Sequence, residues 1–374
     1  MTLDRRSFNR NIAATLGLGL VGRVAHADSA KGADAGGPPG GTFFTSTNSA
    51  AGNAVIAIGR ASSGALGPIA TVPTGGLGSG SGLGSQGAVT LSGDGRHLFV
   101  VNAGSNSVST FTVGASGLAL ASVRDSGGLH PISVSERDGL VYVVNDGGSG
   151  NVAGFRNHGG MLAPIAGSTR PLSAAGGTGP AQVSIGTESD VLIVTEKNTS
   201  LLVSYALAAD GSAGPPRATR SAGATPFGFV FDRRNRLLVS EAGASTLSTY
   251  RFADAAPTVP AVVSAAVPTG QAAACWAMVT PNGRFVYTGN AGTSSISQFA
   301  LDGQGHATLV AGAAATTGNG GAGDMAITVH GRVLGILAPR TPAVLSFAVG
   351  TDGTLDLIGS ATGLPAGVVG LAAS

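Results

Sequence analysis

The chain has 374 residues, of which 43% are apolar and 11% are charged, and its formal net charge is +2. This composition excludes an intrinsically disordered chain, which combines low hydrophobicity with high charge, and no basic patch indicates a nucleic-acid partner. With 62 glycines, the apolar content favours a turn-rich, packed all-β fold over a low-complexity coil. The single cysteine, Cys275, excludes an internal disulfide and a cysteine-based zinc cluster.

Residues 1–27 have the features of an export signal. Asp4-Arg5-Arg6-Ser7-Phe8 resembles the twin-arginine pattern, an apolar run follows over residues 12–21, and Ala25-His26-Ala27 fits an A-x-A cleavage site. The apolar run is too short for a permanent transmembrane helix, so we expect no membrane span in the mature protein. We therefore expect export through the twin-arginine machinery and a periplasmic or secreted location.

The twin-arginine match is incomplete, because Asn9 and Arg10 stand where the usual pattern has Leu and Lys. Removal of residues 1–27 would change the net charge from +2 to about −1, since four arginines and one aspartate lie in this segment. Residues 28–41 are rich in Ala, Gly, Pro and Ser and are expected to form a flexible leader. The folded part is expected to cover residues 42–374 as one domain.

A repeat of about 45 residues organises the folded part. In each unit an apolar strand ends on a distinctive residue, a tight turn follows, and an alternating strand reaches an aromatic residue nine or ten positions later. The residues at the strand ends are Asn102, Asn145, Glu196, Glu241, Asn290 and Ala338. A further strand, often closed by Asp-Gly or Asn-Gly, precedes each pair, and a weaker strand follows. Four short strands at this spacing are typical of propeller blades.

The ends of the folded part complete the repeat. Six full units begin near residues 86, 130, 180, 225, 275 and 323. Residues 42–85 contain three strands but lack the first strand of a unit, whereas residues 365–373 read as a first strand alone. The sequence therefore predicts an all-β, seven-bladed β-propeller with four-stranded antiparallel blades, in which the C-terminal strand closes the first blade and removes an open sheet edge.

Blade geometry brings several titratable residues to one face. In each blade the first strand begins beside the central channel, on the face that we call the top, and the turn after the second strand returns there. Channel mouths are the usual ligand sites of such folds. His130, Glu196 and Glu241 are placed there as candidates for general acid–base catalysis. The other groups that we place at the top are Asp146, Lys197, Asp324 and Arg340.

Structural alternatives exist for every candidate. Glu196 and Glu241 can bond turn amides, as Asn does, and Glu196 can pair with Lys197. His130 can serve only to set the strand entry before Pro131, and Arg340 can be a solvated surface group. Binding candidates with an equally structural reading are Asn102, Asn145 and Asn290 as turn residues and Trp276 as core or channel wall.

Cofactor and metal signals are weak in this sequence. The Gly-x-Gly run over residues 76–84 lies in a loop and does not lead from a strand into a helix, so it is not a dinucleotide site. No pair of His and carboxylate residues has metal-ligand spacing. We expect no cofactor and assign no metal site.

Three segments carry a resemblance to a known family. They are Tyr142-Val143-Val144-Asn145, Tyr287-Thr288-Gly289-Asn290, and the run from Val100 to Asn106. These units resemble the seven-bladed lactonase-like propellers with Y-V-T-N-type repeats, over about residues 42–374. The turn Thr195-Glu196-Lys197 is similar to that of bacterial members often labelled carboxymuconate cyclases.

This resemblance implies a small lactone or carboxylate as substrate, bound at the channel mouth. Some enzymes of the family hydrolyse phosphogluconolactone, and others cyclise carboxymuconate by adding a carboxylate across a double bond. It further implies that His130, Glu196 and Glu241 act as acid or base and that Lys197 and Arg340 hold a carboxylate. The family enzymes use several arginines at the mouth, whereas this chain places one there and the others in bottom turns.

Two functions from different classes therefore stay open. The first is an exported enzyme that hydrolyses or forms a lactone, as a hydrolase or a cyclising isomerase. The second is a non-catalytic periplasmic propeller that binds a ligand or a protein partner. The second predicts that Glu196 is exposed, neutralised by Lys197, and far from any shaped pocket.

Overall fold

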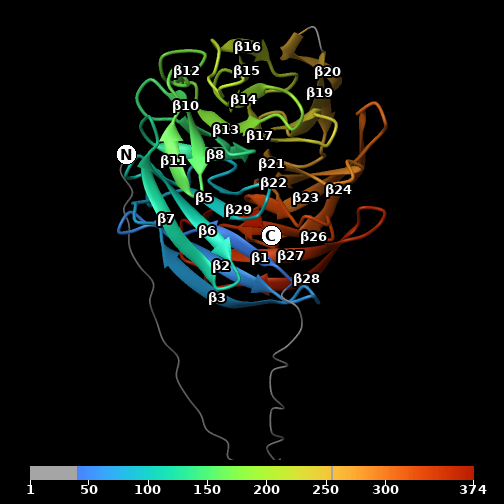
Figure 1. Cartoon of the computed structure of the whole chain (residues 1–374). Helices are drawn as coiled ribbons and strands as arrows, with labels where there is room; N and C mark the ends of the chain where they lie inside the picture. Colours follow the sequence, from blue (N-terminus) through green and yellow to red (C-terminus); the bar gives the residue numbers. More distant parts are fainter. Residues whose placement is uncertain (1–39, 254–255) are drawn as a thin grey trace, which may run out of the picture. The chain divides into compact units, whose positions relative to one another are not determined.

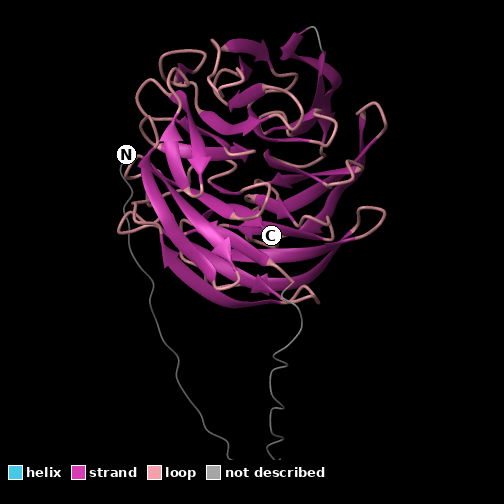
Figure 2. Cartoon of the chain, in the orientation of Figure 1, coloured by secondary structure: helices cyan, strands magenta, loops and turns pink. Residues whose placement is uncertain are grey.

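The computed structural model describes residues 40–253 and 256–374, and these residues form seven antiparallel sheets. Figure 1 shows the sheets arranged as a ring of blades. Within the described residues all regular secondary structure is β-strand, as Figure 2 shows by its single strand colour. The predicted all-β, seven-bladed propeller is confirmed.

The blades are numbered here from the one that contains the first strand of the chain. The strands of blades 1 to 3 are β29 (Val369–Ala373), β1 (Thr42–Ser46), β2 (Ala54–Arg60) and β3 (Leu66–Pro73); β4 (Val89–Leu91), β5 (His97–Asn102), β6 (Ser107–Gly114) and β7 (Gly117–Asp125); and β8 (Pro131–Arg137), β9 (Leu140–Asn145), β10 (Asn151–His158), β11 (Met161–Pro164) and β12 (Arg170–Pro171).

Blades 4 to 7 follow the four-strand pattern. Their strands are β13 (Pro180–Ile185), β14 (Val191–Glu196), β15 (Leu201–Ala206) and β16 (Arg217–Arg220); β17 (Pro226–Phe231), β18 (Leu237–Glu241), β19 (Thr246–Ala253) and β20 (Ala256–Pro268); β21 (Ala274–Val279), β22 (Phe285–Asn290), β23 (Ser295–Leu301) and β24 (Ala307–Thr316); and β25 (Met325–Ile327), β26 (Val333–Ala338), β27 (Ala343–Val349) and β28 (Leu355–Ala361).

The predicted closure of the ring is present in blade 1. Strand β29 at the C-terminus pairs antiparallel with β1, with Phe43 opposite Ala373 and Ser46 opposite Val369. The first strand of each blade contacts the first strands of its two neighbours around the whole ring. Closure therefore leaves no blade without a neighbour, and the innermost strands β4, β8, β13, β17, β21, β25 and β29 surround a central channel.

Tyrosine side chains in second strands tie neighbouring blades together. The hydroxyl of Tyr142 in blade 3 donates to Gly211 O in blade 4 at 2.7 Å, and that of Tyr287 in blade 6 donates to Gly353 O in blade 7 at 2.8 Å. Both rings are fully buried. Burial of the two rings contributes hydrophobic stabilisation, and each hydroxyl fixes its contact with the neighbouring blade.

Removing either hydroxyl is expected to destabilise the fold. Tyr142→Phe and Tyr287→Phe should each lower the free energy of unfolding by about 1–2 kcal/mol, because a buried carbonyl loses its donor. Urea denaturation followed by circular dichroism measures this change. Unfolding free energies equal to that of the wild type would contradict the assigned inter-blade role.

The predicted export signal, residues 1–27, and residues 28–39 of the predicted leader lie outside the described residues. Within the described part of the chain, no helix is long and apolar enough to cross a membrane.

Candidate functional site in the central channel

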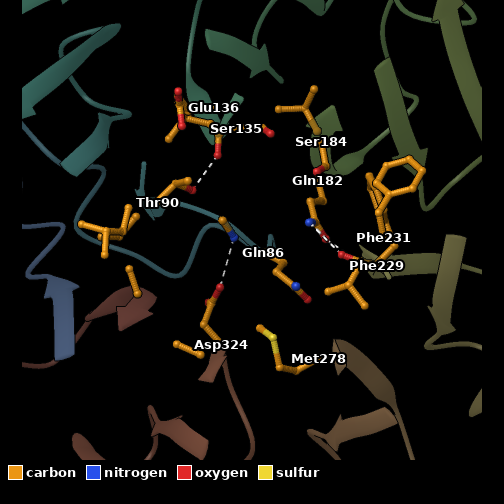
Figure 3. A pocket seen from close by; sticks show the side chains of 18 of the residues that line it. Gln86, Thr90, Ser135, Glu136, Gln182, Ser184, Phe229, Phe231, Met278 and Asp324 are labelled. Atoms are coloured by element: carbon orange, nitrogen blue, oxygen red, sulfur yellow. Dashed lines mark hydrogen bonds between the residues drawn. The ribbon is translucent and has the colours of Figure 1, made fainter. Parts of the chain in front are cut away.

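The central channel contains a cavity of about 560 Å³ (Figure 3). Its lining comes from the first strands of all seven blades, as expected for a site on the axis of a propeller. Cavities of this size accommodate small organic ligands.

The top mouth of this channel is filled by residues 83–88, which we call the plug. This segment follows the glycine-rich loop after β3 and leads into β4. Its backbone bonds to two other blades: Gln86 N–H donates to Ala181 O at 3.0 Å, and Gly87 O accepts from Val134 N–H at 2.9 Å. The place where the sequence predicted a ligand is thus occupied by the chain itself.

Gln86 extends the plug across the channel and lies near the centre of the ring in Figure 3. Its side-chain amide donates to Ala277 O at 3.0 Å and accepts from Ala277 N–H at 3.1 Å, so it pairs with blade 6 as a strand would. A Cβ atom at Gly228 would lie 2.0 Å from Gln86 Oε1. The absence of a side chain at this glycine therefore makes room for the plug.

A second glutamine, Gln182, makes the same kind of bridge lower in the lining. Its amide donates to Phe229 O at 2.9 Å and accepts from Phe229 N–H at 2.7 Å, which joins blade 4 to blade 5. One amide hydrogen of Gln182 takes part in this bridge, and the second is not used in it.

Two of the predicted binding residues hold the plug. Lys197 Nζ donates to Gly84 O at 2.6 Å and to Pro180 O at 2.8 Å, and it lies 5.3 Å from the centre of the Phe227 ring. Trp276 Nε1 donates to Ser85 O at 3.1 Å, and its ring meets the edge of Phe227. Burial lowers the pKa of Lys197, although the negative charge of Asp146 opposes this shift.

Asp324 lies directly beneath the plug and lines the cavity (Figure 3). Its carboxylate accepts from Gly87 N–H at 3.1 Å and from Gly370 N–H at 3.3 Å, and only 5% of the residue is exposed. Burial raises the pKa of Asp324 to about 7, although these two hydrogen bonds and the Trp276 side chain lower it. A carboxyl group with this pKa can both take and give a proton near neutral pH.

The remaining polar lining is mostly hydroxyl. Ser135 Oγ accepts from Ile185 N–H at 3.2 Å, which leaves its own proton for another partner. Thr90 donates to Val134 O at 2.7 Å. Ser184 also lines the cavity.

The bottom end of the channel is bordered by the end of β8 and by the turn residues after β8 and β13. Glu136 is fixed there by Gly139 N–H, at 2.7 Å, and Asp138 and Thr187 are exposed. Arg137 is the one cationic residue of the lining, but its guanidinium is already bonded to Gly186 O and Ser189 O and to the carboxylate of Asp190. The cavity therefore reaches solvent at the bottom, and the cation there is engaged.

The predicted residues at the ends of the second strands lie inside their blades and do not line the channel. Asn102, Asn145, Glu196, Glu241 and Asn290 are all fully buried. Glu196 accepts from Ser173 N–H at 2.9 Å and from the hydroxyls of Ser173 and Thr199, and none of its bonds leads to the channel. The alternative of an exposed Glu196 paired with Lys197 is wrong, because the carboxylate is buried and Lys197 Nζ bonds to backbone carbonyls.

Glu241 has an even larger set of donors. Oε1 accepts from Ser221 Oγ at 2.8 Å and from Gly223 N–H at 2.6 Å, and Oε2 accepts from Ser248 Oγ at 2.8 Å. Thr246 Oγ1 also donates to Oε2. A carboxylate suits this position because the groups around it are donors.

The asparagines each donate hydrogen bonds through their side-chain amides. Asn102 accepts from Thr74 Oγ1 at 2.8 Å and donates to Ser109 Oγ at 2.7 Å, whereas Asn145 donates to Ser126 O. An amide can donate these hydrogen bonds and a carboxylate cannot. Blades 4 and 5 thus carry glutamate where their neighbours carry asparagine because the local donor set differs. Catalytic roles for Glu196 and Glu241, and binding roles for the asparagines, stay predictions.

His130 and Arg340 lie outside the cavity lining. His130 has a backbone φ of +55°, is half-buried, and donates its backbone N–H to Asn106 Oδ1 at 2.8 Å. Arg340 is exposed and its guanidinium donates to Ala291 O at 2.7 Å and to Ser294 Oγ at 3.3 Å. The structure therefore brings Lys197 and Trp276 to the plug but does not join His130, Glu196 and Glu241 in this cavity. The roles predicted for His130 and Arg340 are untested.

Sequence reasoning missed Gln86 and Gln182, and it placed Asp324 at the top without assigning it a role. A signal was present for the glutamines: each is a long amide side chain at or near the start of a first strand that is otherwise apolar or small. Across the described ranges, no group of three or more His, Cys, Asp or Glu residues could hold a metal ion.

Comparisons with known proteins agree with this architecture. The family model described as "Lactonase, 7-bladed beta-propeller" matches residues 52–166, which confirms the resemblance to the lactonase-like propellers. No curated protein matches the sequence.

Similar solved structures include a "putative 6-phosphogluconolactonase" from Bacteroides fragilis, with 17% identity over 89% of this chain and 98% of that chain and a TM-score of 0.68. A protein from Lactobacillus plantarum has 14% identity over 90% and 100% of the two chains and a TM-score of 0.71. The periplasmic gluconolactonase of Pseudomonas aeruginosa has 19% identity over 68% and 78% and a TM-score of 0.57. At these identities the structures show a shared fold.

Proposed function

We propose that this protein is a lactonase-type hydrolase that opens a small, uncharged lactone in the central channel. The observation that carries the proposal is Asp324, a buried carboxyl group with a pKa of about 7. It lines a cavity that the plug closes at the top. The family match and the gluconolactonase of Pseudomonas aeruginosa support the reaction class. Export by the twin-arginine route and a periplasmic or secreted location belong to the same proposal and rest on residues 1–27.

The residues of the channel provide the steps that hydrolysis requires. Ionised Asp324 takes a proton from a water molecule as the water oxygen bonds to the lactone carbonyl carbon. The free hydroxyl proton of Ser135 and the second amide hydrogen of Gln182 are the donors available to the oxyanion. Asp324 then returns the proton to the ring oxygen as the ring C–O bond breaks, which gives an open hydroxy acid.

The charge of the lining favours a neutral substrate and hydrolysis over cyclisation. A cyclising enzyme must bind a carboxylate, and a phosphorylated lactone brings two negative charges into the channel. Arg137, the one cation of the lining, is committed to two carbonyls and Asp190. An anion would therefore enter a channel that contains Asp324 and no available counter-charge among its lining residues.

This proposal predicts a substrate preference. The protein should hydrolyse glucono-δ-lactone with a kcat/KM at least roughly tenfold above that for 6-phosphogluconolactone, since one unpaired charge costs more than about 1.4 kcal/mol in such a site. Acid release in a pH-stat, corrected for spontaneous hydrolysis, measures both rates. A preference for the phosphorylated lactone would contradict the channel site, and hydrolysis of neither would favour the non-catalytic binding propeller.

A further inference from the structure

The plug is anchored at consecutive backbone carbonyls by two side chains from different blades. Gly84 O accepts from Lys197 Nζ of blade 4, and Ser85 O accepts from Trp276 Nε1 of blade 6. Gly84 has a φ of +58°, in the left-handed region that favours glycine. Within the described ranges Lys197 is the single lysine, so no neighbouring lysine can replace this anchor.

The anchor on the plug is itself held by the buried glutamate beside it. Glu196 is fixed by Ser173 and Thr199, and the backbone N–H of Lys197 donates to Gly179 O at 2.9 Å. The lysine side chain therefore starts from a rigid turn and reaches a fixed point on the plug. The two adjacent residues of opposite charge therefore have separate partners. Glu196 is bonded inside the blade, and Lys197 is bonded to the plug.

Three residues beyond Gly84 the plug contacts Asp324. Gly87 N–H donates to Asp324 Oδ1, and Gly87 has a φ of +83° with Ser133 Oγ only 3.0 Å from the position of an added Cβ. Gly87 is therefore held closely in place. A displacement at Gly84 or Ser85 reaches Asp324 through this short, tightly bonded segment, and it also opens the mouth above the carboxyl group to water.

We propose that Lys197 is a positioning residue of the channel site, which acts on Asp324 through the plug without touching the substrate. Trp276 also anchors the plug, but its side chain acts on the Asp324 carboxyl directly as well. This inference rests on the proposed function for its consequence in catalysis, but the coupling itself can be measured without a substrate. The other charged residues that line the channel are Glu136, Arg137 and Asp138 at its bottom end, and Lys197 lies behind the plug.

Loosening the plug should change the proton affinity of Asp324 in a defined direction. Burial is the main cause of its high pKa, and the hydrogen bonds from Gly87 N–H, Gly370 N–H and the Trp276 side chain have the opposite, smaller effect. Loosening the plug at Lys197 removes the first of these bonds. Water entering at the mouth should therefore outweigh the loss of this one hydrogen bond, so the pKa of Asp324 should fall.

The test uses Lys197→Met, which keeps the apolar stem and removes the donor to Gly84 O and Pro180 O. Lys197→Arg restores a donor, and Arg251→Met removes an exposed cation as the matched control. Each is compared with the same variant carrying Asp324→Asn, and the difference in unfolding free energy is followed against pH. As the pH rises, this difference changes until the pH passes the pKa of Asp324 in the folded protein, and it is constant above that value. We call the pH at which it becomes constant the levelling point.

We expect the levelling point to fall by about one pH unit in Lys197→Met, and to remain at the wild-type value in Lys197→Arg and Arg251→Met. If the protein hydrolyses a lactone, the rise of its activity on the acidic side of the pH profile should move by the same amount. An unchanged levelling point in folded Lys197→Met would overturn the inference. A shifted levelling point in a protein that hydrolyses no lactone would support the coupling and overturn the proposed function alone.

Discussion

Replacing Asp324 by asparagine is expected to lower kcat/KM for glucono-δ-lactone by roughly 10²- to 10⁴-fold, the usual contribution of a positioned general base. The amide has nearly the same shape and can still accept a hydrogen bond from Gly87 N–H, but it cannot take a proton from water. Asp356→Asn, on the exposed face of β28, is the matched control and should retain full activity. Full activity of a folded Asp324→Asn protein would exclude the carboxyl group as the base.

The pH dependence of the wild type follows from the same residue. Activity should rise with pH and level off above about pH 7, because only the ionised carboxylate is a base. Stability should change in the opposite direction. Folding raises the pKa of Asp324 from 3.8 to about 7, so between these values the native state holds a proton that the unfolded chain has released.

The contribution of Asp324 to stability is therefore fully present at low pH and is lost as the pH rises through 7. Relative to Asp324→Asn, the wild type should lose up to about 4 kcal/mol of unfolding free energy between pH 4 and pH 7. Urea titrations of both proteins across this range measure the loss. A difference that does not vary with pH would show that Asp324 titrates normally.

Replacing Glu241 by leucine should cost about 3–5 kcal/mol of unfolding free energy, because Gly223 N–H and three hydroxyls lose their common acceptor in the interior of blade 5. Glu241→Gln keeps one acceptor oxygen and should cost less. Glu188→Leu, in an exposed turn, is the control and should change stability by less than about 0.5 kcal/mol.

The same variants distinguish the structural role of Glu241 from the catalytic role predicted from the sequence. Glu241→Gln should hydrolyse glucono-δ-lactone at the wild-type rate at temperatures where it is folded. A Glu241→Gln protein with wild-type stability and no activity would instead support the catalytic role.

The fold was predictable from the sequence because its signals are local and repeated. The turn glycines and the apolar strands recur in every unit, and the lone strand at the C-terminus has the pattern that the N-terminal blade lacks. Pairing of β29 with β1 follows from that pattern. The face on which Lys197 and Asp324 lie was also predictable, since strand direction sets it.

The site itself was not predictable for physical reasons. The plug bonds to backbone groups of Ala181 and Ala277, and a backbone group leaves no trace in the sequence. The direction of a side chain at the end of a strand, into its own blade or into the channel, depends on its partners, as Glu241 shows. The raised pKa of Asp324 depends on burial under the plug, which follows a glycine-rich loop more than 230 residues earlier in the chain.

The most direct test of the channel site is a crystal structure of the protein with gluconolactam, an analogue that keeps the ring and carbonyl of the lactone and resists hydrolysis. The account predicts the analogue inside the channel, with its carbonyl near Gln182 and Ser135, Asp324 beside the carbonyl carbon, and the plug in place above it. An analogue bound instead at the top surface, among His130, Asp146 and Arg340, would contradict it.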